Sequence, residues 1–193
     1  MTKALKAPSL VTPADPVHRH RMLETNRLVL RKWKRSDEMH VATILGDPDV
    51  MAFSDHGVLT SKQLLAWFEK ACAVCPDDLL SGPLAIAQKA TDDLIGYIGL
   101  SHDPDRIAEG DAEIGFRLSK SVWGQGYASE AAAELVRRTN EVSSISRIVA
   151  IVDPGNTRSI RVLDKLGMSL VGEIMFDGYD YPDMFYALKL RDT

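Results

Sequence analysis

A strand, a glycine turn, an amphipathic helix and a second strand follow one another in the second half of the chain. Residues 112–118 alternate between apolar and polar side chains, and residues 147–152 (RIVAIV) form the continuous apolar run of a strand covered on both faces. Between them, residues 125–140 repeat small and apolar residues with the period of a helix. Because such a connection is a right-handed crossover, we expect the two strands to be parallel neighbours in one sheet.

The segments on either side of this unit predict one mixed α+β domain, residues 23–193. Several are rich in Ile, Leu, Val and Tyr and predict strands, whereas Ser36 and Ser61 can cap two early helices. The predicted order is β-α-α-β-β-β-α-β-α-β-β. The further strands are 27–33, 84–89, 94–101, 169–176 and 185–190, and the further helices are 36–45, 61–75 and 156–166.

The N-terminal segment and the charge exclude several classes of protein. Residues 1–22 contain Pro8, Pro13 and Pro16, which break any signal-peptide core or membrane span, so we expect a mobile tail. The formal net charge is −4, and no segment gathers the lysines and arginines that a nucleic acid requires. We therefore expect a cytoplasmic protein with neither a nucleic-acid nor a membrane partner.

The cysteines and histidines predict neither a redox site nor a metal site. Cys72 and Cys75 lie in an amphipathic helical segment, with no second cysteine pair or nearby histidine to complete a tetrahedral site. We therefore expect both cysteines to pack as small apolar residues. The five histidines show no metal-ligand spacing, so no metal is assigned.

Two glycines, Gly124 and Gly126, stand at the start of the helix predicted for residues 125–140. The first N–H groups of a helix lack intrahelical partners and lie at the positive end of its dipole, so they can hold a phosphate. Glycine lets a pyrophosphate approach the backbone closely, and the charge of Glu130 is expected to point to solvent. The loop lacks the glycine patterns typical of nucleoside triphosphate and dinucleotide sites.

At this loop the chain resembles the GCN5-related N-acetyltransferases, the GNAT superfamily, whose pyrophosphate loop is Gln/Arg-x-x-Gly-x-Gly/Ala. The sequence from Trp123 to Ala128, WGQGYA, replaces the first residue of that pattern by tryptophan, which is the usual form in the RimJ/RimL-like branch of ribosomal-protein N-terminal acetyltransferases. Other segments resemble that branch in order and spacing. They are Thr25–Arg31, Asp47–Val50, Glu113–Leu118, Asn156–Ser159 and Lys165–Met168.

The resemblance implies the GNAT fold, a mixed and mostly antiparallel sheet with a central parallel pair of strands. It also implies an enzyme that uses acetyl-CoA as co-substrate and no metal. Members of this branch are often homodimers, and the sequence leaves the oligomeric state of this chain open. The glycine loop would hold the pyrophosphate, mainly through backbone amides, and the preceding strand would contact the pantetheine arm. The implied acetyl-CoA contacts are Phe116, Leu118, Gly124, Gln125, Gly126, Tyr127, Ala128 and Asn156.

Acetyl transfer to an amine requires a base that deprotonates the amine and an acid that protonates the CoA thiolate. Glu113, on the strand leading into the glycine loop, is the candidate base; the alternative is a solvated strand residue or a partner of Arg117. In the RimJ/RimL-like branch, the motif matched by Asn156 and Ser159 supplies the acid, although both residues are also suited to capping a helix. Many relatives have a tyrosine where this chain has Leu163.

The sequence leaves the acceptor open. The resemblance implies a protein N-terminal α-amine, and a small-molecule amine such as an antibiotic, polyamine or amino acid is the alternative. A non-catalytic acetyl-CoA sensor is the alternative outside enzymes, and Leu163 favours it. The loop 177–183 carries aspartates and tyrosines that suit a positively charged acceptor, or are solvated turn residues. The reserve proton donors are Tyr179, Tyr181 and Tyr186.

Overall fold

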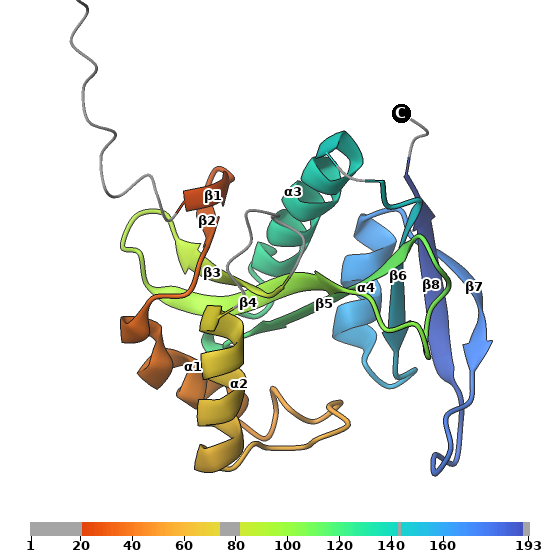
Figure 1. Ribbon diagram of the computed structural model, residues 1–193, viewed down its shortest axis with the longest axis horizontal. Helices are drawn as coiled ribbons and strands as arrows, with labels where there is room; N and C mark the ends of the chain where they lie inside the picture. Colours follow the sequence, from red (N-terminus) through yellow and green to blue (C-terminus); the bar gives the residue numbers. More distant parts are fainter. Residues whose placement is uncertain (1–20, 74–81, 143, 191–193) are drawn as a thin grey trace, which may run out of the picture.

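The computed structural model describes residues 21–73, 82–142 and 144–190, which form an 8-stranded sheet with helices on both faces (Figure 1). The strands are β1 (Arg21–Glu24), β2 (Leu28–Arg31), β3 (Leu84–Gln88), β4 (Leu94–Ser101), β5 (Asp111–Leu118), β6 (Arg147–Val152), β7 (Ser169–Ile174) and β8 (Asp183–Lys189). The helices are α1 (Glu38–Leu45), α2 (Ser61–Ala73), α3 (Tyr127–Val142) and α4 (Thr157–Lys165), with 3-10 turns η2 (Arg35–Asp37) and η3 (Lys120–Val122).

The sheet contains one parallel pair of strands. Its order is β1-β2-β3-β4-β5-β6-β8-β7, and all neighbours are antiparallel except β5 and β6. The helix α3 connects these two strands, as the crossover rule predicts. The predicted α+β class and the central parallel pair are therefore confirmed.

One strand, β1, is absent from the predicted order. It pairs with β2 across a turn, and its first residue, Arg21, lies inside the segment predicted as a tail. A strand of 4 residues is too short to show the alternation that marks a strand in a sequence. Residues 1–20 lie outside the described residues, so the mobility of the tail stays a prediction.

Two hydrophobic cores lie on opposite faces of the sheet. α3 and α4 cover one face, where Ala131, Ala132 and Leu135 of α3 are buried, which confirms the predicted apolar stripe of that helix. α1 and α2 cover the other face around Phe68 and Tyr97. In Figure 1, α3 lies above the sheet and α1 and α2 lie below it. The central strands are thus held from both sides.

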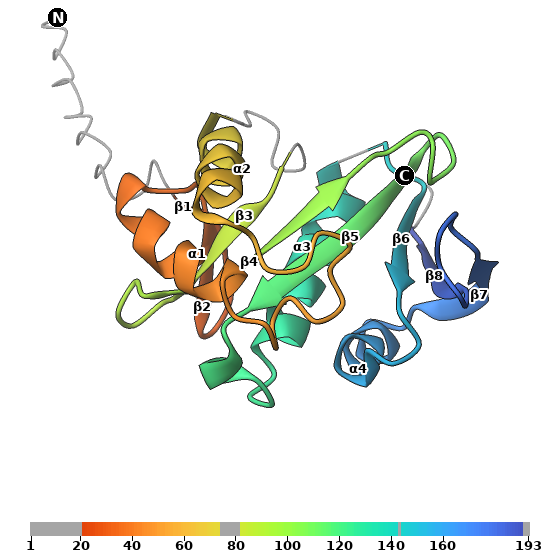
Figure 2. The same ribbon diagram turned by 90° about the horizontal axis from the view of Figure 1, so that it is seen from below.

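The parallel pair β5 and β6 separates along its length. Its register runs only from Asp111, opposite Arg147, to Glu113, opposite Val149, although β5 continues to Leu118. Beyond this point β5 remains paired with β4 on its other side. Figure 2 shows β5 and β6 diverging toward α4. The second half of β5 therefore presents a backbone edge that no β6 residue covers.

The cysteine prediction is tested only in part. Cys72 is half-buried against the α1–α2 core, as predicted for a small apolar residue, and Cys75 lies outside the described residues. None of the helices in the described ranges is long and apolar enough to cross a membrane.

Candidate active site

A cleft opens where β5 and β6 diverge. Its volume is ≈ 750 Å³, which lies within the usual range for a small-molecule site. The walls are β5, the end of β6, the first turns of α3 and α4, and the α1–α2 loop, residues 46–60. Most of the residues predicted for the site line this one cleft: Glu113, Phe116, Leu118, Gly124, Gly126, Tyr127, Ala128, Asn156 and Ser159.

The glycine loop presents a row of free backbone amides to the cleft. Gly124 and Gly126 have φ of +75° and +82°, which only glycine adopts without strain, and α3 begins at Tyr127 rather than at Gln125 as predicted. The amides from Gly124 to Ser129 have no hydrogen-bond acceptor among the described residues. Unpaired amides at a helix N-terminus form an anion site, so the loop fits the pyrophosphate of acetyl-CoA.

Gln125 is the one predicted contact whose side chain turns away from the cleft. Its Nε2 donates to the carbonyl of Ser121 at 3.2 Å, and its own carbonyl accepts from Arg27. Only its backbone amide is therefore available to a phosphate.

Trp123 joins the loop to the two elements beside it. Its indole Nε1 donates to the carbonyl of Leu118, the last residue of β5, at 2.9 Å. The guanidinium of Arg158, in the first turn of α4, lies 4.6 Å from the centre of the Trp123 ring. The tryptophan that sets this loop apart from the general pattern therefore fixes the loop between β5 and α4.

The charge of Glu130 does not point to solvent, so that prediction is wrong. Its carboxylate accepts hydrogen bonds from Thr25 Oγ1 at 2.5 Å, from the Arg27 amide at 3.0 Å and from Arg27 Nε at 2.6 Å. Burial disfavours its charged form, but the hydrogen bonds from Thr25 and Arg27 outweigh it and lower the pKa of Glu130. The negative charge beside the anion site is thereby neutralised.

Arg27 also holds the loop itself. Its Nη1 donates to the carbonyl of Gln125 at 3.0 Å, and its guanidinium lies 4.2 Å from the centre of the Tyr127 ring. The Gln125 carbonyl accepts from Arg27 and from none of the helix amides that face the cleft. We call Thr25, Arg27 and Glu130 the loop clamp. Thr25 and Arg27 belong to a segment that resembles the RimJ/RimL-like branch, but the sequence alone indicates no role for them.

The loop clamp should control the affinity for acetyl-CoA. Arg27→Met and Glu130→Gln should each weaken CoA binding about tenfold in titration calorimetry, because a loose loop must be ordered on binding. A purely electrostatic role predicts opposite signs, since loss of Glu130 removes a negative charge near the phosphates. Arg137→Met is the matched control, because Arg137 pairs with Glu134 and Glu141 on the exposed face of α3. Tighter binding by Glu130→Gln would contradict the clamp.

Glu113 lies where β5 and β6 part. No described residue forms a hydrogen bond or ion pair with its carboxylate, and the alternative of a pair with Arg117 is wrong, because Arg117 Nη1 donates to Tyr97 Oη at 2.8 Å. Burial raises the pKa of Glu113; Arg106 opposes the shift, and Asp55 and Asp103 add to it. A carboxylate with a raised pKa, open to the cleft and without a partner, is suited to accept a proton.

Asn156 caps α4, and Ser159 lies in its first turn. The Asn156 Oδ1 accepts from the Ser159 amide at 3.1 Å, so the capping role considered for Asn156 is confirmed. The Ser159 hydroxyl has no partner among the described residues and lines the cleft. Leu163, where many relatives have tyrosine, is buried in the core.

The reserve tyrosines are poorly suited to protonate a thiolate. Tyr179 and Tyr181 are exposed, and their hydroxyls donate to Asp55 at 3.2 Å and to Asp153 at 2.9 Å. Those carboxylates raise the pKa of both phenols, which makes them weaker acids. Tyr186 is buried, only 5% exposed.

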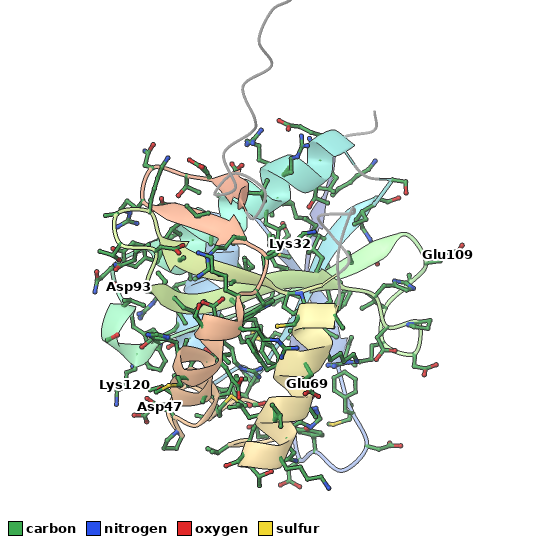
Figure 3. All side chains as sticks on the ribbon, turned by 60° about the vertical axis from the view of Figure 1, so that its left-hand side comes forward. Lys32, Asp47, Glu69, Asp93, Glu109 and Lys120 are labelled. Atoms are coloured by element: carbon green, nitrogen blue, oxygen red, sulfur yellow. The ribbon has the colours of Figure 1, made fainter. Side chains whose placement is uncertain are left out.

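Charge divides the cleft into two ends. Three basic side chains of α4 line the cleft, Arg158, Arg161 and Lys165, and Arg158 stacks on Trp123 of the glycine loop. Lys120 of η3, just before this loop, pairs with Asp49. Figure 3 shows Lys120 on the same side of the molecule as Asp47. The other part is bounded by the loops at 46–60, 102–110 and 175–182 and is rich in carboxylates. We call it the acidic end; its charged lining residues are Asp55, Glu113, Asp153, Asp183 and Arg106.

Comparisons with known proteins agree with this arrangement. The family model described as "Acetyltransferase (GNAT) domain" matches residues 27–169. The uncharacterized N-acetyltransferase p20 of Bacillus licheniformis is 31% identical over 153 residues, 78% of this chain and 83% of p20. A GNAT-family acetyltransferase structure from Bacillus anthracis superposes with a TM-score of 0.75 at 26% identity, covering 86% of this chain and 97% of that one.

A more distant structure shows the fold with ligands. The spermidine N-acetyltransferase of Vibrio cholerae, in complex with CoA and spermine, superposes with a TM-score of 0.69 at 16% identity, over 86% of this chain and 97% of that one.

The chain therefore belongs to the GNAT family and is an acetyl-CoA-dependent N-acetyltransferase. The family match, the parallel pair that opens at Glu113 and the amide row at α3 agree on this assignment. Among the described residues, no group of 3 or more His, Cys, Asp or Glu side chains could hold a metal ion.

Proposed function

We propose that the cleft transfers the acetyl group directly from acetyl-CoA to a primary amine bound at its acidic end, within a ternary complex. The observation that carries this proposal is the position of two unused groups in one cleft. The amide row of the glycine loop has no protein acceptor, and the carboxylate of Glu113 has no protein partner among the described residues. An anion cradle and a base in one cleft suit direct transfer, which needs no acyl-enzyme.

Acetyl-CoA would lie along the edge of β5. Its pyrophosphate would accept from the amides at Gly124–Ser129, and its pantetheine amides would pair with the backbone near Phe116 and Leu118, where β6 no longer covers β5. This direction carries the thioester toward Glu113. Basic side chains of α4 favour the phosphate part of the cofactor at the opposite end.

Two proton transfers complete the reaction. Glu113 takes the first proton from the ammonium, directly or through water, and the neutral amine attacks the thioester carbonyl. The N–C bond forms, the C–S bond breaks, and in the net reaction the second amine proton passes to the CoA sulfur. Ser159 donates its proton to the departing thiolate and regains the second amine proton from the nitrogen that becomes the amide, and Glu113 returns its proton to solvent. Asn156 positions Ser159 by capping its helix. The tyrosines of the 175–182 loop are less suited, because their hydroxyls are bound to carboxylates.

The acidic end selects a positively charged amine. Burial raises the pKa of Asp183, the neighbouring carboxylates of Asp153 and Asp55 add to the shift, and Arg106 opposes it. The carboxylates that line this end support a positively charged acceptor. Within that class, the Trp123–Ala128 resemblance supports an acceptor of the RimJ/RimL-like kind, a protein N-terminal α-amine. A small-molecule amine is the second candidate, supported by the likeness in fold to the spermidine N-acetyltransferase.

Thiol release tests this proposal. We expect CoA thiol to form when acetyl-CoA is mixed with the protein and an amine from a panel of α-amino peptides, amino acids and polyamines. The initial rates should rise with both substrates in intersecting double-reciprocal plots, which is the pattern of a ternary complex. Tight acetyl-CoA binding without thiol release from any amine would instead make the chain an acetyl-CoA sensor. Parallel plots would indicate an acyl-enzyme.

A further inference from the structure

Arg106 is held at the acidic end of the cleft. It belongs to the 102–110 loop, and its guanidinium stacks 4.8 Å from the centre of the Phe176 ring. The backbone amides of Arg106 and Ile107 donate to the carbonyl of Asp103 at 3.0 and 2.9 Å, and Ile107 is buried, 6% exposed. The side chain is thus fixed from two sides, on the wall that faces the proposed acceptor.

The guanidinium of Arg106 is unused within the protein. No described residue accepts a hydrogen bond from it, and no described carboxylate comes within 4.0 Å of its nitrogens. Its Nε is shut off from solvent without an acceptor. Arg106 nevertheless acts electrostatically on both Glu113 and Asp183. An arginine that is surrounded by carboxylates but paired with none of them is available for an oxygen atom of a ligand.

We propose that Arg106 binds the carbonyl or carboxylate oxygen next to the acceptor's amino group. The acceptors are then α-amino acyl compounds, either free amino acids or the first residue of a peptide, rather than plain alkylamines or polyamines. This inference rests on the proposed function. It assigns three of the charged residues at the acidic end: Glu113 and Asp183 face the ammonium, and Arg106 faces the oxygen. A polyamine would instead bring a further positive charge against Arg106.

Matched acceptors test the proposal in the wild type and in Arg106→Gln. Propylamine, 2-aminobutyrate and 2-aminobutyramide share one carbon chain and differ only in the group beside the amine. We expect the wild type to prefer the last two in kcat/KM, corrected for the fraction of neutral amine, by at least about tenfold. Arg106→Gln should remove that preference, so that its kcat/KM values for the three amines lie within about twofold of one another. If the wild type prefers 2-aminobutyrate to 2-aminobutyramide, its acceptor is a free amino acid. The opposite preference indicates the first residue of a peptide.

The ratio between acceptors is the decisive quantity. Loss of Arg106 also changes the charge around Glu113, which would affect all amines alike, so the three acceptors are compared as ratios at one alkaline pH. Arg138→Gln, on α3 beside Glu141, is the control and should keep the wild-type ratio. Equal losses for all three amines, or a wild type that favours propylamine or spermidine, would overturn the proposal.

A binding experiment tests the role of Arg106 independently of the proposed acetyl transfer. Titration of the CoA complex with N-acetyl-2-aminobutyrate and with N-propylacetamide measures recognition without turnover. We expect tighter binding of the former in the wild type and no difference in Arg106→Gln. If no amine releases thiol but this difference is present, the transfer proposal fails and the Arg106 proposal stands. If thiol is released but Arg106→Gln matches the wild type in both the kinetic comparison and the titration, the Arg106 proposal fails and the transfer proposal stands.

Discussion

Replacing Gly126 by glutamate should weaken acetyl-CoA binding by more than about 100-fold. Gly126 has φ of +82°, a region that a residue with a side chain enters only at a cost of about 1–3 kcal/mol. An added Cβ would lie 3.6 Å from Arg27 Nη2, so the new carboxylate can compete with Glu130 for Arg27. It would also place a negative charge beside the pyrophosphate. Titration calorimetry with acetyl-CoA measures the effect.

Two further variants separate the effect of backbone strain at Gly126 from the effect of the added negative charge. Gly126→Ala adds the backbone strain without the charge and should cost about tenfold in affinity. Gly178→Glu adds a charge at an exposed glycine of similar backbone conformation, φ +89°, in the β7–β8 loop, and should leave acetyl-CoA binding unchanged. If Gly126→Glu binds acetyl-CoA within about threefold of the wild type while folded, the glycine loop does not hold the pyrophosphate.

The topology around the cleft was predictable because local patterns determine it. The alternation over residues 112–118, the helical repeat after Gly126 and the apolar run 147–152 each specify one element, and the crossover rule makes the strands parallel. The strand β6 begins and ends where the sequence predicts, at Arg147 and Val152. By contrast, β1 is a short edge strand whose place depends on pairing with β2 rather than on its own pattern.

The contacts that complete the candidate site are long-range and leave little local signal. Arg27 and Glu130 are 103 positions apart in the sequence, and nothing in either segment indicates that they meet. The sequence around Glu130 predicts a solvent-exposed carboxylate, because its own helix contains no indication of the contact with Arg27. Arg106 lies in a polar loop with the composition of any turn. Its importance emerges only when the fold places it against Phe176 and beside Glu113.

Glu113→Gln should lower kcat at neutral pH by about 100-fold or more, the usual range for loss of a general base. Glutamine keeps the size of the side chain but cannot accept the proton. The wild type should lose kcat/KM as the pH falls through the raised pKa of Glu113, because the protonated carboxyl cannot act as a base. The variant should lack this acid limb, and its deficit should shrink at high pH, where the amine is already neutral.

Glu109→Gln is the matched control, because Glu109 is an exposed carboxylate in the loop just before β5 and is not among the residues that line the cleft; Figure 3 shows it at the edge of the molecule. It should keep the wild-type rate and pH profile. A pH-independent loss in Glu113→Gln would indicate a structural role for Glu113 and would leave the cleft without a base.

Thermal unfolding distinguishes these outcomes further, because the pKa of Glu113 fixes the sign of its effect on stability. A carboxyl whose pKa is raised in the folded state binds its proton more tightly there than in the unfolded chain, so its contribution to stability falls as the pH rises through that pKa. Above that pKa the wild type carries this penalty and the neutral glutamine does not. Glu113→Gln should therefore unfold at the same or a higher temperature than the wild type. A catalytic loss without a stability loss is the signature of a base held in a partly buried site for its chemistry.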